Sequence, residues 1–215
     1  MDRLFNMDNK FFTFMGKVAD LMILNIVFLI CCIPIITIGA SVTAMNYVTL
    51  KMVKNEDSYI IKSFFKSFKA NFKQATIIWL ILLATSFLIG FDFRIMQQLE
   101  VTLPTKILNY GIYMITFIFA MLLAYIFPLL SKFENTTINT FKNSLLMAIR
   151  HLPSTFLILI ITFLPAIASI LIPIVLIYGA IVWILIGFAL TSFLTSLFFT
   201  RIFARYIPEE ETVLS

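Results

Sequence analysis

The longest stretch without a charged residue or histidine reads LPSTFLILIITFLPAIASILIPIVLIYGAIVWILIGFALTSFLTSLFFT and occupies residues 152–200. As one α-helix it would be about 74 Å long, more than twice the roughly 30 Å hydrocarbon core of a bilayer. Pro173 lacks a backbone donor and breaks a helix, and Gly179 follows shortly after it. The stretch therefore predicts two membrane-crossing helices, 153–172 and 176–200, joined by a tight turn.

The composition of the whole chain agrees with a membrane location. Of 215 residues, 61% are apolar and 13% are charged, against about 25% charged residues in an ordinary soluble domain. A chain with so few charges lacks the polar surface that a water-soluble globule needs. The same figures exclude a disordered chain and a disulfide scaffold. We therefore expect one integral membrane domain over residues 1–215.

Three further uncharged runs extend the pattern: Leu21–Leu50, Gln74–Phe91 and Ile107–Ser131. The last two have 18 and 25 residues, and each is long enough for one crossing, which takes about 20 residues. They predict a second hairpin, with helices at 75–92 and 107–130.

The first run is ambiguous, because 30 residues make about 45 Å of helix, too long for one crossing and short for two. Residues 32–39, CIPIITIG, have the composition of a tight turn, and we expect Thr37 to cap the returning helix. This favours a hairpin of 13–33 and 36–53. The alternative is a single crossing followed by a re-entrant or surface helix. The predicted fold is thus an all-α, polytopic transmembrane bundle with about six crossings, or five under the alternative.

The basic residues set the orientation, since loops on the cytoplasmic side carry an excess of Lys and Arg. In the six-crossing arrangement, 14 of the 16 Lys and Arg residues fall on one side, and only Arg94 and Lys106 fall on the other. The five-crossing arrangement gives 11 against 5. Both place the C-terminus in the cytoplasm, so we expect a multi-pass membrane protein with a cytoplasmic C-terminus. Orientation explains the net charge of +5, and we expect no nucleic-acid binding.

Two amphipathic segments, 56–74 and 135–151, are predicted to be cytoplasmic linkers between the hairpins. In the first, an apolar row at helical spacing runs beside a lysine row with the same spacing. This pattern is typical of a helix in the membrane interface. It serves either as an anchor that fixes topology or as a docking helix for a partner protein. The membrane-interface or docking residues are Ile61, Lys62, Phe65, Lys66, Phe68, Lys69, Phe72 and Lys73.

The sequence contains few residues in patterns that suit catalysis or metal binding. His151 is the only histidine, and no Gly-rich phosphate loop, acid–base pair or Cys/His metal spacing is present. We therefore expect no enzymatic activity, no cofactor and no metal site. Uncharged polar and small residues within the helices predict close helix packing or a polar path for a ligand. These residues are Asn25, Asn46, Gly187, Thr191 and Thr195.

Several motifs resemble the YesL family, a bacterial membrane family of unknown function. They are Asn25, the segment from Pro34 to Ser41 (PIITIGAS), Glu56-Asp57, the block from Phe64 to Gln74 (FFKSFKANFKQ), and Leu152-Pro153. The resemblance covers the whole length and is most distinctive over residues 25–76. Its turn residues are Pro34, Thr37, Gly39 and Ser41.

The resemblance implies a role in sugar import, because genes of the family typically accompany genes for ABC-type oligosaccharide importers. It supplies no catalytic or ligand residues. We expect an accessory or assembly component of such an importer, with membrane lipids and ABC permease subunits as partners. Two alternatives are a permease-type transport subunit and a lipid-interacting structural protein. The segment from Arg150 to Pro153 is similar to the loop by which importer permeases contact their ATPase, but that loop's Glu-Ala-Ala start is absent.

Overall fold

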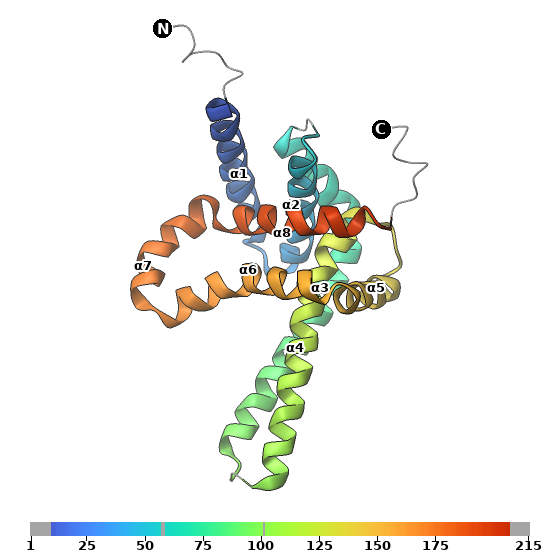
Figure 1. The fold of residues 1–215 in the computed structure, drawn as a ribbon, viewed down its shortest axis with the longest axis vertical. Coiled ribbons are helices and arrows are strands. Elements are labelled where there is room, and N and C mark those ends of the chain that lie inside the picture. The colour runs from blue at the N-terminus through green and yellow to red at the C-terminus, as the bar shows by residue number, and fades with distance from the viewer. Residues whose placement is uncertain (1–9, 57–58, 101, 207–215) are drawn as a thin grey trace, which may run out of the picture.

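The computed structural model describes residues 10–56, 59–100 and 102–206, and every regular element in these residues is a helix (Figure 1). This confirms the predicted all-α class. Asp57, quoted for the family resemblance, lies outside the described residues. The elements are α1 (Lys10–Cys32), the short 3-10 helix η1 (Ile35–Thr37), α2 (Ile38–Val53), α3 (Ile60–Gln98), α4 (Leu103–Lys132), α5 (Thr137–Arg150), α6 (Leu152–Leu171), α7 (Pro173–Val182), the π-helical turn η2 (Trp183–Gly187) and α8 (Phe188–Phe203).

Five helical stretches of the described residues are long and apolar enough to cross a membrane. This confirms a multi-pass membrane protein and equals the lower of the two expected numbers of crossings. The helix α2 is not among the five, because its 16 residues reach only about 24 Å. The five stretches are Phe12–Cys32, Ile60–Gln98, Leu103–Lys132, Leu152–Leu171 and Pro173–Phe203.

The helix α3 is uninterrupted over 39 residues and is therefore about 58 Å long. Residues 60–74, expected to be a linker, form its first part, and the crossing expected at 75–92 continues to Gln98. The second linker helix, α5, is separated from α6 only by His151. Both amphipathic segments therefore lead directly into long apolar helices.

The α1–α2 turn packs against the middle of α3. A Cβ on Gly39 would lie 2.5 Å from the Ala75 carbonyl oxygen and 2.6 Å from Trp79 Cβ, so only glycine permits this approach. The indole Nε1–H of Trp79 donates a 2.8 Å hydrogen bond to the Ile35 carbonyl. Beyond Trp79, α3 continues for 19 residues to Gln98, a further 28 Å or so. The turn and the far end of α3 are thus separated by about one bilayer thickness along this helix.

The α6–α8 hairpin lies across the α1–α2 hairpin. Asn25 on α1 bonds to the backbone of η2, and Thr49 on α2 bonds to Ser192 and Ser196 of α8. The η2–α8 segment therefore passes from α1 to α2, and in Figure 1 α6 and α8 run across the direction of α3 and α4.

Both long hairpins extend away from the corner of the bundle where α5 and the ends of α2, α4 and α8 lie (Figure 1). Their outer parts expose large apolar side chains, such as Phe87 on α3 and Ile170 on α6. Surfaces of this kind suit hydrocarbon better than water. The polar corner and the apolar hairpins therefore divide the molecule into a membrane part and an interfacial part.

Candidate functional site

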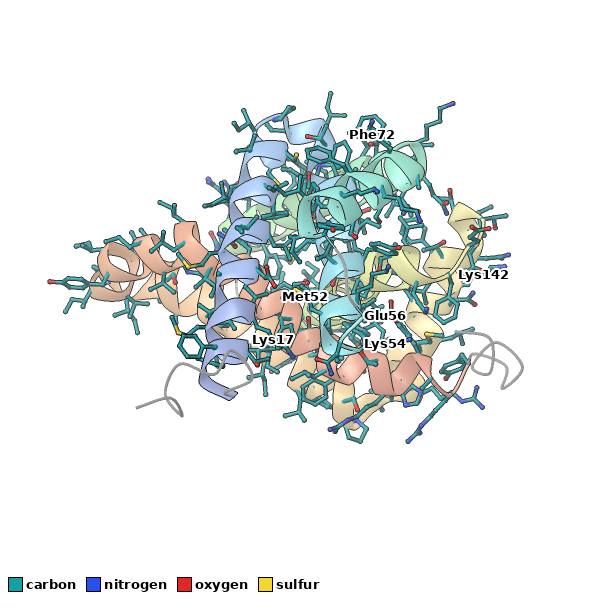
Figure 2. All side chains as sticks on the ribbon, turned by 90° about the horizontal axis from the view of Figure 1, so that it is seen from above. Lys17, Met52, Lys54, Glu56, Phe72 and Lys142 are labelled. Carbon is teal, nitrogen blue, oxygen red and sulfur yellow. The ribbon has the colours of Figure 1, made fainter. Side chains whose placement is uncertain are left out.

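The eight predicted docking residues lie on one surface of the first half of α3. All four lysines are exposed, as are Ile61, Phe65 and Phe72, and Phe68 is half-buried. The ring centroids of Phe65 and Phe68 are 6.3 Å apart, and those of Phe68 and Phe72 are 5.5 Å apart. The three rings form a continuous aromatic row beside the lysines. In the view from above, Phe72 lies at the outer edge of the molecule, away from Lys54 and Glu56 (Figure 2).

The structure adds Phe64, which the sequence analysis missed. This side chain is fully buried in a cluster with Ala44 and Val48 of α2, and its ring stacks on Phe68 at 6.1 Å. Phe64 fixes the rotation of α3, so the row at Phe65 and Phe72 is held outward. The available signal was the helical spacing of Phe64, Ser67, Ala75 and Ile78, a second and less polar face of the same helix.

The family-like turn closes the end of α1. The Thr37 hydroxyl donates to the carbonyls of Cys31 and Pro34, at 2.6 and 2.7 Å. The Ser41 hydroxyl donates to the carbonyls of Cys31 and Thr37, at 3.2 and 2.9 Å. The expectation that the Thr37 side chain caps α2 is wrong: Thr37 occupies the N-cap position, but its hydroxyl donates to the Cys31 carbonyl at the end of α1 and to the Pro34 carbonyl in the turn, and makes no capping bond to α2. Pro34, Thr37, Gly39 and Ser41 thus shape a turn that fits against α3.

Asn25 and Gly187 are brought together at the π-helical turn η2. The buried Asn25 amide donates to the carbonyls of Trp183 and Ile184, at 3.0 and 2.7 Å, and its oxygen accepts from the Ala189 N–H at 3.0 Å. A π-helical turn disturbs the regular backbone pairing, and in an apolar environment every such group needs a partner. A Cβ on Gly187 would lie 2.6 Å from the Trp183 ring, so glycine lets this indole fold back over the turn.

A buried hydroxyl cluster joins α2 to α8. The Thr49 oxygen lies 2.9 Å from the hydroxyls of both Ser192 and Ser196, and Ser192 donates to the Asn46 side-chain oxygen at 3.3 Å. By contrast, Thr191 and Thr195 donate to carbonyls of their own helix. Of the expected polar set, Asn25 and Asn46 therefore bond between helices, and the neighbouring serines make the contacts expected of the two threonines.

His151 lies where α5 meets α6, at the edge of the bundle. Its Nε2 is 3.1 Å from the Tyr206 hydroxyl, which follows the end of α8. Partial desolvation, with Arg205 and Arg150 nearby, lowers the pKa of His151 below its ordinary value of 6.5. The neutral imidazole is thus favoured, and it can accept the hydrogen bond from Tyr206.

Comparisons with known proteins match the part of the chain that contains the turn and the aromatic row. Residues 21–93 match the family model described as "Protein of unknown function, DUF624". The "Uncharacterized protein YesL" of Bacillus subtilis (strain 168) is 27% identical over 127 residues. The match covers 59% of this chain and 59% of that relative's length. The comparison with solved structures finds no significant match.

The matched segment contains Asn25, the turn from Pro34 to Ser41 and the first half of α3. These are the most distinctive motifs of the resemblance, and they build the contacts between α1, α2 and α3; Leu152-Pro153, also quoted for it, lies outside the matched segment. The resemblance found in the sequence is therefore confirmed as a similarity: residues 21–93 match the family model, and the chain is similar to YesL of Bacillus subtilis over 59% of its length.

Proposed function

We propose that this protein is an accessory or assembly component of an oligosaccharide ABC importer in the bacterial cytoplasmic membrane, with its C-terminus in the cytoplasm. The link to sugar import rests on the family resemblance and the gene neighbourhood it implies. The orientation rests on the excess of basic residues at one end of the predicted crossings.

The observation that carries the proposal is the exposed aromatic row beside the lysine row on the first half of α3. Aromatic side chains dominate the energetics of protein interfaces, and surrounding charges select the partner. Because α3 packs on α2 through Phe64 and Gly39, this face is held rigid before it binds. The loss of conformational entropy on docking is then small. The partner we propose is the permease pair, contacted where its helices leave the cytoplasmic leaflet.

One observation favours the alternative of a permease-type subunit. The short helix α5 lies between α4 and α6, which are both long and apolar enough to cross a membrane, and exposes Ile138, Leu146 and Ile149. A short helix between two crossings is the arrangement by which a permease would contact an ATPase. The third candidate, a lipid-interacting structural protein, requires only that the aromatic row insert into the bilayer.

Co-purification in mild detergent from the native host separates these three functions. The wild-type chain is compared with the variant F65A/F72A, which shortens two exposed rings of the row. The matched control is F87A/F91A, which shortens two exposed rings in the second half of the same helix.

The proposal predicts that a permease pair accompanies the wild type and the control but is lost from F65A/F72A. Recovery with an ATPase and no other permease would favour the permease function. Recovery of the chain alone, with unchanged sugar uptake after gene deletion, would rule out both transport roles.

A further inference from the structure

Two neighbouring cavities lie where the ends of α2, α4 and α8 meet. The first, of about 250 Å³, is lined by residues of all three helices, among them Leu50, Lys132 and Phe203. The second, of about 470 Å³, lies between α3 and the end of α4 and is lined in part by Lys66 and Asn71. The two share a wall made of Tyr47, Ser131 and Lys132.

The walls of these cavities carry excess positive charge. Four lysines and two glutamates line them, a net charge of +2, namely Lys51, Lys54, Lys66 and Lys132 with Glu56 and Glu134. Lys51 and Lys54 share Glu56, each at 3.8 Å. Within the described residues, neither Lys66 nor Lys132 has a carboxylate within ion-pair distance. Lys132, in the wall that the two cavities share, can therefore bind an anion from either cavity.

The first cavity combines this cationic rim with an apolar floor. Leu50 and Phe203 are both buried beneath it, while Tyr47 and Thr200 add hydroxyl groups to the wall. A small inorganic anion would use the rim and leave the floor empty. A ligand with both phosphate groups and hydrocarbon matches both parts.

Helix ends explain only part of this pattern. Lys51 and Lys132 lie in the last turns of α2 and α4, where a cation offsets the negative end of the helix dipole. Lys66 lies in the second turn of α3, where a cation gains nothing from the dipole. Dipole compensation also leaves the two adjoining cavities without an explanation.

We propose that the two cavities bind the headgroup of a diphosphate phospholipid of the cardiolipin type, with one phosphate on each side of Lys132. Basic pockets between membrane helices on the cytoplasmic side suit such headgroups, and the apolar hairpins extend away from this corner (Figure 1). The site shares Lys66 with the lysine row of α3 but contains none of the rings of the aromatic row, and lipid binding by the purified chain can be measured without the proposed importer partner.

Lipid binding to the purified, delipidated full-length chain tests the proposal. Native mass spectrometry measures the affinity for cardiolipin, phosphatidylglycerol and phosphatidylcholine added separately, with and without excess inorganic phosphate. The variants are K132Q, K66Q and the control K142Q; Lys142 lies on α5 and lines neither cavity (Figure 2). Thermal unfolding in detergent without lipid checks the fold of each variant.

We expect cardiolipin to bind at least about tenfold more tightly than phosphatidylglycerol, and inorganic phosphate not to displace it. K132Q and K66Q should each weaken cardiolipin binding about fivefold, as the loss of one lysine near a membrane surface predicts, while K142Q leaves it unchanged. If K132Q fails to fold, the cardiolipin affinity of K66Q alone tests the proposed site.

Three results overturn the proposal. Equal affinity for cardiolipin and phosphatidylglycerol would show that the cavities do not bind two phosphates. Displacement by inorganic phosphate shows a small-anion site, and equal effects of K142Q and the cavity variants show nonspecific attraction to a basic surface.

Discussion

The side-chain amide of Asn25 bonds to the Trp183 carbonyl at 3.0 Å, across 158 residues of sequence. This contact and its two companions at Ile184 and Ala189 join the first helix to the π-helical turn of the last hairpin. They fix where α8 crosses the α1–α2 hairpin, and so they help to set the angle between the α1–α2 hairpin and the α6–α8 hairpin.

Replacing Asn25 by leucine should destabilise the protein by about 2–3 kcal/mol, because two carbonyls and one N–H lose a buried partner. Thermal unfolding in detergent measures the change. The control is Ser86→Ala, since within the described residues the Ser86 hydroxyl bonds only to the Leu82 carbonyl of its own helix. Equal melting temperatures for Asn25→Leu and the wild type would show that η2 needs no side-chain partner.

Gly39 should not tolerate a methyl group. Gly39→Ala places a Cβ 2.5 Å from the Ala75 carbonyl oxygen, so α2 must move away from α3 at a cost of about 1–3 kcal/mol. Gly111→Ala is the matched control, because nothing lies within 4 Å of the added atom, and it should stabilise α4 by up to about 1 kcal/mol. Similar unfolding temperatures for the two variants would contradict the close approach of α2 and α3.

The sequence predicts the helical class, the break before Pro173 and the apolar and lysine rows at the start of α3, because each depends on local pattern alone. It does not predict the Asn25 contact, since nothing near Asn25 specifies a partner 158 residues away. The apolar rows at Phe65 and at Phe64 have the same spacing, so periodicity could not tell the buried face from the exposed one. Nor could uncharged runs show that the last hairpin lies across the first.

The sequence also does not predict that the residues lining the two cavities lie together. Lys51, Lys132 and Phe203 come from helices far apart in the chain, and each lysine is also explained by the orientation rule. Only the packing of three helix ends brings them to one place.

The α1–α2 turn and the α3–α4 loop should lie at different depths in the membrane, because about 28 Å of α3 separates them. Single cysteines at Ile35 and at Glu100 test this in a background in which Cys31 and Cys32 are alanine. A membrane-impermeant maleimide added outside intact cells should label position 100 and spare position 35. Equal labelling of both would indicate three parallel hairpins of the kind first expected from the uncharged runs.

Acidification should destabilise the folded protein through His151. The pKa of His151 is lowered in the folded protein, so the unfolded chain binds the proton more tightly, and stability falls as the pH drops through 6.5 toward the folded-state value. Melting temperatures between pH 8 and pH 5 should therefore fall more for the wild type than for His151→Gln. Parallel curves for the two proteins would exclude this linkage.

The most direct test of the proposed importer role is cross-linking in living cells from α3. A photoreactive phenylalanine analogue replaces Phe65 in one strain and Phe87 in another, and the adducts are identified by mass spectrometry. The proposal predicts adducts with an importer permease from position 65 and with lipid alone from position 87. Lipid adducts alone from both positions would contradict it, because the aromatic row would then face the bilayer and no partner protein.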